Sequence, residues 1–141
     1  MNILKIYNLP IYDKDNLSDS DKEELYAYAN EVGLAEIVVY FLISALAMDV
    51  RYLQLLRGQI NDTINNTDCY SNVGDINILT ISANKIYVVG TFYFLWLNYS
   101  KYIQSLNSDE EMSEQINDWQ DFIASLMIFI ATVLSGSNLT L

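Results

Sequence analysis

The sequence contains no histidine and a single cysteine, Cys69, among its 141 residues. Without histidine, the Ser-His-Asp type of catalytic triad, the common zinc sites and the Glu-x-x-His pairs of ferritin-like di-iron bundles are all excluded. One thiol cannot form an internal disulfide, and Cys69 has no nearby base to activate it. Since no glycine-rich phosphate loop or nucleophile motif is present either, we expect no enzymatic activity, no cofactor and no bound metal.

Basic residues are also scarce, with 7 lysines and arginines against 18 acids and a net charge of -11. A chain this acidic is repelled by phosphates, so we expect no direct binding of nucleic acid. The acids form two groups, at residues 13–24 and 109–121. Each group either caps a helix and keeps it solvated or binds a basic partner or a hard cation, although neither has the EF-hand spacing. The candidate surface for a basic partner consists of Asp109, Glu110, Glu111 and Glu114.

Proline and glycine are rare, with one and five copies, while apolar residues make up 52% of the chain. Few residues therefore interrupt regular structure, and the apolar content argues against disorder. The length is typical of one domain. These features predict a single all-α domain over residues 1–141, an antiparallel bundle of about four helices. Two of the helices are long and apolar, and residues 1–18 form an extended N-terminal arm and linker.

The first half of the chain predicts two helices. A capping box of Ser20 with Glu23 starts the first, with Ser18 and Asp21 as a rival pair. Gly33 either ends this helix or is carried through it. The second helix covers residues 34–57, because Arg57 followed by Gly58 is a stop signal. Residues 59–74 are then predicted to form a long polar loop, an uncommon feature inside a compact domain.

The second half predicts two further helices. Asp75 caps a helix over residues 76–106, although residues 76–82 also alternate as a strand does. Within it, Gly90 either allows the close approach of another backbone or is a tolerated defect. A capping box of Ser108 with Glu111 starts the last helix, which runs to about residue 135 with Gly136 as its stop.

Surplus apolar surface indicates assembly. Residues 86–97 are apolar nearly all round, and residues 116–134 carry two apolar faces, more than a lone four-helix bundle covers. We therefore predict a self-assembling, non-enzymatic helical subunit, such as a virion or shell component, and a homo-oligomer. On this interpretation Phe129→Asp dissociates or unfolds the protein. The candidate assembly interface consists of Phe92, Phe94, Trp96, Phe122, Phe129 and Val133.

Two other functional hypotheses remain. The protein is either an acidic inhibitor that occupies the basic site of a host protein, or a small membrane-associated or tail-anchored protein. A spanning helix needs about 20 mostly apolar residues, whereas the uncharged runs at residues 37–48 and 86–97 have about 12 each. Residues 122–141 are uncharged but end in polar residues, and no basic cluster flanks any segment. Residues 1–12 do not resemble a signal peptide. These features favour a soluble protein, cytoplasmic or part of an assembled particle.

Overall fold

The computed structural model describes residues 3–4, 12–13, 15–107 and 112–137. It contains α1 (Asp19–Asn65), α2 (Asn77–Asn107) and α3 (Met112–Ser137), together with the two-residue strands β1 (Ile3–Leu4) and β2 (Tyr12–Asp13). The strands pair antiparallel, with Ile3 opposite Asp13 and Leu4 opposite Tyr12. The predicted all-α class is confirmed. The predicted four helices are wrong, because the described residues form three.

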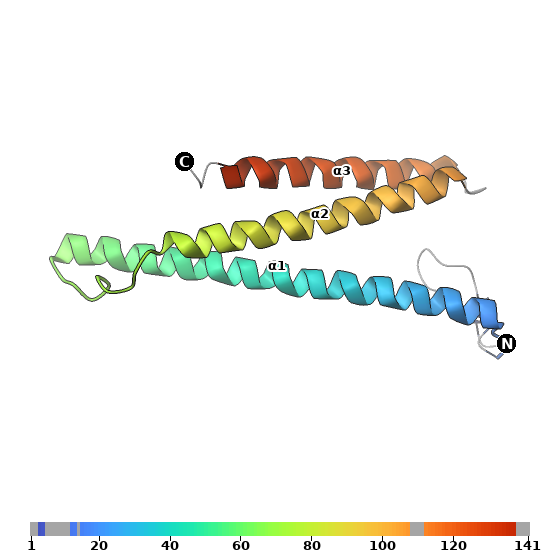
Figure 1. Cartoon of the computed structure of the whole chain (residues 1–141), viewed down its shortest axis with the longest axis horizontal. Coiled ribbons are helices and arrows are strands. Elements are labelled where there is room, and N and C mark those ends of the chain that lie inside the picture. Colours follow the sequence, from blue (N-terminus) through green and yellow to red (C-terminus); the bar gives the residue numbers. More distant parts are fainter. Residues whose placement is uncertain (1–2, 5–11, 14, 108–111, 138–141) are drawn as a thin grey trace. The chain divides into compact units, whose positions relative to one another are not determined.

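The chain divides into two compact units, Met1–Ile37 and Val38–Leu141. The first unit contains the short strand pair and the start of α1. The second contains the rest of α1 and both of the other helices. Within the second unit, α2 and α3 pack against each other along their lengths and run in opposite directions (Figure 1).

The helix α1 begins at the rival capping box and not at Ser20. The Asp21 amide donates to Ser18 Oγ at 3.1 Å, and the Ser18 amide donates to the Asp21 carboxylate at 2.8 Å. Two orphan amide donors at the helix start are thereby satisfied. Hydrogen bonds from the Ser18 side chain and amide to the Asp21 carboxylate hold the pKa of Asp21 below its usual range. The prediction of Ser20 with Glu23 as the box is therefore wrong by two residues.

The same helix continues through both glycines that the sequence offered as stops. A methyl group at Gly33 would meet no atom within 4 Å, so no packing contact requires glycine at this position. Gly58 lies under the ring of Tyr70, where a methyl group would come within 2.8 Å of Tyr70 Cδ1. Of the two alternatives at Gly33, the helix is carried through it, whereas the stop predicted at Gly58 is wrong. The first two helices of the prediction are therefore one helix.

The actual end of α1 is set by Asn66, whose φ of 54° is left-handed. The Thr67 amide donates to the Asp62 carbonyl oxygen at 2.9 Å, which closes a Schellman motif with Asn66 in the left-handed position. The polar loop predicted over residues 59–74 is consequently shorter, because residues 59–65 belong to α1. Sequence inspection favours glycine at this position, whereas asparagine also tolerates the conformation.

The helix α2 begins as the sequence predicts. Asp75 Oδ1 accepts a hydrogen bond from the Asn77 amide at 3.0 Å. Residues 77–82 are helical, so the alternative of a short strand there is wrong. The capping box predicted from Ser108 and Glu111 lies outside the described residues. The last helix, α3, passes through the predicted stop at Gly136 to end at Ser137.

Candidate functional site

Aromatic side chains line one end of the contact between α2 and α3. Between ring centroids, Tyr102 lies 5.2 Å from Trp119 and 6.0 Å from Phe122, and Tyr99 lies 5.5 Å from Phe122. Pairs at these separations stabilise a helix contact beyond their buried area. This aromatic cluster (Tyr99, Tyr102, Trp119 and Phe122) fixes the antiparallel register of the two helices.

Polar side chains join the same two helices next to the aromatic cluster. Asn98 Nδ2 donates a hydrogen bond to Ser125 Oγ, which in turn donates to the Asp121 carbonyl oxygen at 2.7 Å. Farther along, Gln115 Nε2 donates to the Ser105 carbonyl oxygen at 3.2 Å. Ser105 and Ser125 are both buried. The interior of the helix pair is thus partly polar and hydrogen-bonded.

Several other close contacts between helices involve very small residues. A methyl group on Gly90 of α2 would lie 2.7 Å from Leu42 Cδ2 of α1. A methyl group on Gly136 of α3 would lie within 2.8 Å of Asn84 Cγ of α2. Ala45 and Ala83 have no exposed surface at all. The atoms nearest to Gly90 are side-chain atoms of Leu42 and Val38, so the close approach there is to side chains of α1 and not to another backbone.

Large apolar side chains, in contrast, point outward from all three helices. In the most apolar 18-residue stretch of each helix, only 6–11% is buried inside the structure. Met127 is 67% exposed and Val89 is 70% exposed. Burial is therefore inverted relative to a soluble domain, in which large aliphatic side chains are the ones most often buried. Other exposed members include Ile37, Phe41, Ile43, Leu46, Phe92, Trp96, Ile128, Ile130 and Leu134.

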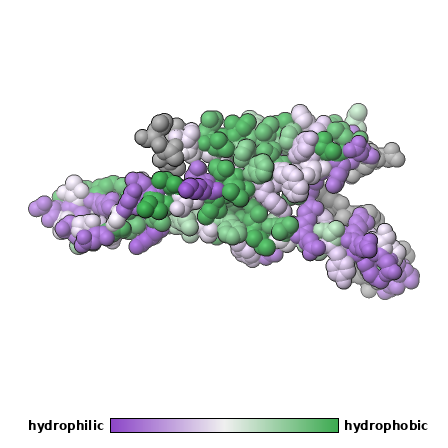
Figure 2. Space-filling view, viewed as in Figure 1, coloured by the Kyte–Doolittle hydropathy of each residue, from purple (hydrophilic) through white to green (hydrophobic). Residues whose placement is uncertain are grey.

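The uncharged stretches of the three helices lie alongside one another in the second unit. They are residues 38–48 of α1, 86–97 of α2 and 122–134 of α3, and we call them together the apolar belt. Gly90 lies against Val38 and Leu42, which aligns the first two stretches. Phe92 and Phe129 have ring centroids 5.7 Å apart, which aligns the last two. Figure 2 shows hydrophobic residues gathered over the middle of these helices.

Charged residues stand at both edges of the apolar belt. Asp49 and Lys85 mark one edge, while Lys101 and Asp121 mark the other. Asp49 accepts a hydrogen bond from the Tyr87 hydroxyl at 3.0 Å, which ties α1 to α2. The partner of Asp49 is therefore a tyrosine on the neighbouring helix.

Serine and threonine hydroxyl groups of the apolar belt bond within their own helices. Ser44, Thr91 and Thr132 each donate to a carbonyl oxygen three or four residues earlier, at 2.6–2.8 Å. Each of these three hydroxyl groups thereby has a partner that is not water. The belt therefore presents an apolar exterior although its sequence contains serine and threonine.

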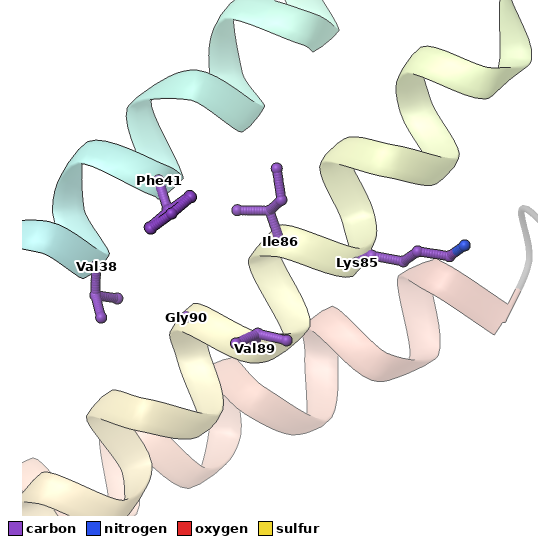
Figure 3. Close-up of a pocket in the computed structure, with 6 residues that line it drawn as sticks. All are labelled: Val38, Phe41, Lys85, Ile86, Val89 and Gly90. Atoms are coloured by element: carbon purple, nitrogen blue, oxygen red, sulfur yellow. The ribbon is translucent and has the colours of Figure 1, made fainter.

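A groove of about 320 Å³ opens between α1 and α2 within the apolar belt (Figure 3). Phe41 and Ile86 point toward each other across it, and Gly90 lies beside it. Lys85 contributes the only charged side chain of its lining, and its amine points away from α1. The groove is lined by Val38, Phe41, Lys85, Ile86, Val89 and Gly90.

The residues predicted as an assembly interface divide into two kinds. Phe92 and Phe129 contact each other, although Phe92 is also exposed on its other side, and Phe122 belongs to the aromatic cluster, so these three contribute to packing within the chain. Trp96 and Val133 remain exposed, whereas Phe94 is half-buried with its ring 5.5 Å from that of Tyr93.

The predicted surface for a basic partner is largely outside the described residues. Asp109, Glu110 and Glu111 fall in the undescribed connection between α2 and α3, while Glu114 is exposed in the first turn of α3. In the described part of the chain, no three acidic or cysteine side chains come together as a metal site. The prediction of a basic partner stays a prediction.

Sequence reasoning missed the groove and the inverted burial, because both depend on which helix faces meet. No protein-family model matches the chain, and neither a curated protein nor a solved structure matches it. The interpretation of the surface therefore rests on its physical chemistry.

Proposed function

We propose that this chain is an integral membrane protein, a non-enzymatic helical subunit whose three helices cross the bilayer. The observation that carries the proposal is the inverted burial within the apolar belt. Small residues such as Gly90 and Ala83 occupy the helix contacts, and large aliphatic side chains face outward. Helices in lipid pack in this way, because lipid tails solvate large apolar side chains and small residues let backbones approach.

The helix lengths support the proposal. All three helices are long and apolar enough to cross a membrane. At 1.5 Å per residue, the 26 residues of α3, the shortest, span about 39 Å, against a hydrocarbon core of about 30 Å. The uncharged runs are shorter than the helices that contain them, because each helix continues beyond the first charged residue.

One edge of the apolar belt has the composition of a membrane interface. Tyr99, Tyr102 and Trp119 lie together near one edge. Tyrosine and tryptophan are enriched at the headgroup level, where the ring is apolar and its polar group reaches water. The local hydrogen bonds of the belt hydroxyl groups also fit a bilayer, because lipid offers them no partner.

The soluble assembly predicted from the sequence would have to cover the same apolar belt with further copies of the chain. That hypothesis explains exposed aliphatic residues, but it does not explain small and polar residues at the contacts within the chain. Cell fractionation separates the two. We expect the full-length chain to stay with membranes after an alkaline carbonate wash and to be released only by detergent.

A matched pair of lysine substitutions sharpens this test. Ile43 lies in the apolar belt and Ile64 lies near the end of α1, and both are exposed. A lysine at the centre of a span costs about 3 kcal/mol of insertion free energy, whereas one near the interface costs little. Ile43→Lys should therefore reduce the carbonate-resistant fraction, and Ile64→Lys should not. A discrete oligomer in detergent-free supernatant would refute the membrane proposal and support the soluble assembly.

A further inference from the structure

The groove between α1 and α2 differs from the rest of the apolar belt because it is concave. Phe41 and Val89 form its outward walls, and both are well exposed, so the groove opens to the surroundings of the protein. Apart from Lys85, the lining offers no polar side chain. A polar ligand there would lose hydration without gaining hydrogen bonds. The groove therefore suits a hydrocarbon chain.

Lys85 adds charge at the edge of the apolar belt. It is the only charged residue between Asp75 and Lys101, and it forms no ion pair with any residue that the structure describes. Its methylene stem lines the groove while its amine points away from α1 (Figure 3). Lysine side chains at the edge of a membrane span adopt this arrangement, with the stem in hydrocarbon and the ammonium at the headgroup level.

We propose that the groove binds one anionic phospholipid, with an acyl chain along Phe41, Ile86 and Val89 and the phosphate beside the Lys85 ammonium. The inference rests on the proposed membrane location. The occupant is an anionic lipid, because the Lys85 ammonium lies where the lipid headgroup would be. A lipid with a net negative charge would neutralise this ammonium. The net charge of -11 repels anionic lipids in general, so any preference for them has to come from a local cation such as Lys85.

The test uses the purified full-length chain in detergent and native mass spectrometry. Phosphatidylglycerol and phosphatidylcholine with identical acyl chains are added separately, and the fraction of chains that retain one lipid gives an apparent affinity. The wild-type chain should bind phosphatidylglycerol more tightly than phosphatidylcholine. Lys85→Gln should weaken phosphatidylglycerol binding about fivefold, the attraction expected of one lysine near an anionic surface, and should leave phosphatidylcholine unchanged.

Two matched controls accompany this variant. Lys101→Gln removes the other lysine of α2, at the opposite edge of the apolar belt. It should not change the preference for phosphatidylglycerol over phosphatidylcholine. Val89→Trp fills the groove from its exposed wall and should weaken the binding of both lipids. Ile128→Trp, on the exposed surface of α3, should weaken the binding of neither. Circular dichroism checks that each variant keeps its helices.

Several outcomes would overturn the proposal. Equal binding of the two lipids, or equal effects of Lys85→Gln and Lys101→Gln, would remove the assigned headgroup site. A dimer that Val89→Trp disrupts would show that a second copy of the chain fills the groove. Displacement of the lipid by inorganic phosphate alone would show an anion site without an acyl chain. In each of these cases the chain still requires detergent, so the proposed membrane location survives. A chain soluble without detergent would instead refute that location.

Discussion

At the scale of residues, the contacts between the helices depend on side chains with few atoms and on hydrogen bonds. Gly90, Gly136 and Ser125 lie where another helix approaches, and Asn98 reaches across from α2 to α3. In a bilayer such contacts replace the hydrophobic driving force that assembles soluble cores. Single substitutions at these positions should therefore have measurable effects, although the side chains are small.

The pair of Asn98 and Ser125 should show direct coupling. We expect a double-mutant cycle of Asn98→Ala and Ser125→Ala, measured by unfolding in mixed micelles, to give an interaction free energy of about 0.6 kcal/mol. Ser100 serves as the control, because its hydroxyl donates to the Trp96 carbonyl oxygen within α2. A cycle of Asn98→Ala with Ser100→Ala should give no coupling. Additive effects in the first cycle would contradict the hydrogen bond between the helices.

The loop after α1 should respond to acid through Asp62. Its carboxylate accepts hydrogen bonds from Thr67 Oγ1 at 2.7 Å and from the Tyr70 amide at 2.6 Å. The hydrogen bond from Thr67 is the main cause that lowers the pKa of Asp62 below its ordinary value of 3.8. Since the folded pKa is lowered, the stabilisation is present above the ordinary pKa and is lost as the pH falls through the folded pKa.

Amide exchange by NMR checks this prediction. Protection of the Tyr70 amide should hold at neutral pH and decrease below about pH 4, where the carboxylate begins to be protonated. Asp62→Asn should reduce the protection already at neutral pH and remove most of its pH dependence. Asp68→Asn is a control in the same loop, since the Tyr70 amide donates to the carboxylate of Asp62 and not to that of Asp68. An unchanged pH profile in Asp62→Asn would contradict the assignment.

At the scale of elements, α1 shows how a helix passes a residue that usually ends one. Its 47 residues include Gly33 and Gly58, and it ends only where Asn66 turns left-handed. Glycine disfavours a helix without forbidding it, and a long run of helix-forming and apolar neighbours outweighs one such residue. The local environment of each glycine then decides what a larger residue would do.

Alanine substitutions at two glycines should separate these environments. Gly33 has open space around the position of a methyl group, so Gly33→Ala should stabilise α1 by about 1 kcal/mol through helix propensity. Gly90→Ala makes the same chemical change, but its methyl group would lie 2.7 Å from Leu42 Cδ2 and 3.2 Å from Leu42 Cγ. It should therefore lower the free energy of unfolding in mixed micelles. Equal gains at both positions would show that α1 and α2 do not approach closely at Gly90.

At the scale of the whole molecule, the apolar belt is a property of three helices together. Each stretch alone is short, and only their alignment produces a continuous apolar surface bounded by charged and aromatic residues. If the belt lies in a bilayer, the loop before α2 and the connection after it emerge on opposite sides, because α2 crosses once. This consequence can be tested with the natural cysteine.

Thiol labelling should report the two sides. Cys69 is exposed in the loop between α1 and α2, and it is the only cysteine of the chain. In sealed membrane vesicles of one orientation, a membrane-impermeant maleimide should label either the wild-type Cys69 or the cysteine of Cys69→Ser/Ser113→Cys, but not both. Ser113 is exposed near the start of α3. Detergent should make both accessible. Labelling of both in intact vesicles would contradict a spanning α2.

The sequence by itself determined the secondary-structure class and several local features of this protein. Scarce proline and glycine and a high apolar content led to the all-α prediction, and Asp75 marked the start of α2, because capping is a local interaction. The helix number and the ends of α1 were predicted wrongly. Those boundaries depend on competing local signals, such as Ser18 against Ser20 and Gly58 against Asn66, whose balance the surrounding chain decides.

Only the tertiary structure decided which residues meet between helices. Sequence periodicity recognised Phe92, Phe122 and Phe129 as apolar, but it did not show that Phe92 contacts Phe129 or that Phe122 packs in the aromatic cluster. It also did not show that Val89 and Met127 face outward. Nor did it pair Asp49 with Tyr87 or bring the stem of Lys85 to an apolar groove. These relations join positions far apart along the chain, and they follow from the register and rotation of packed helices, which small residues and hydrogen bonds set.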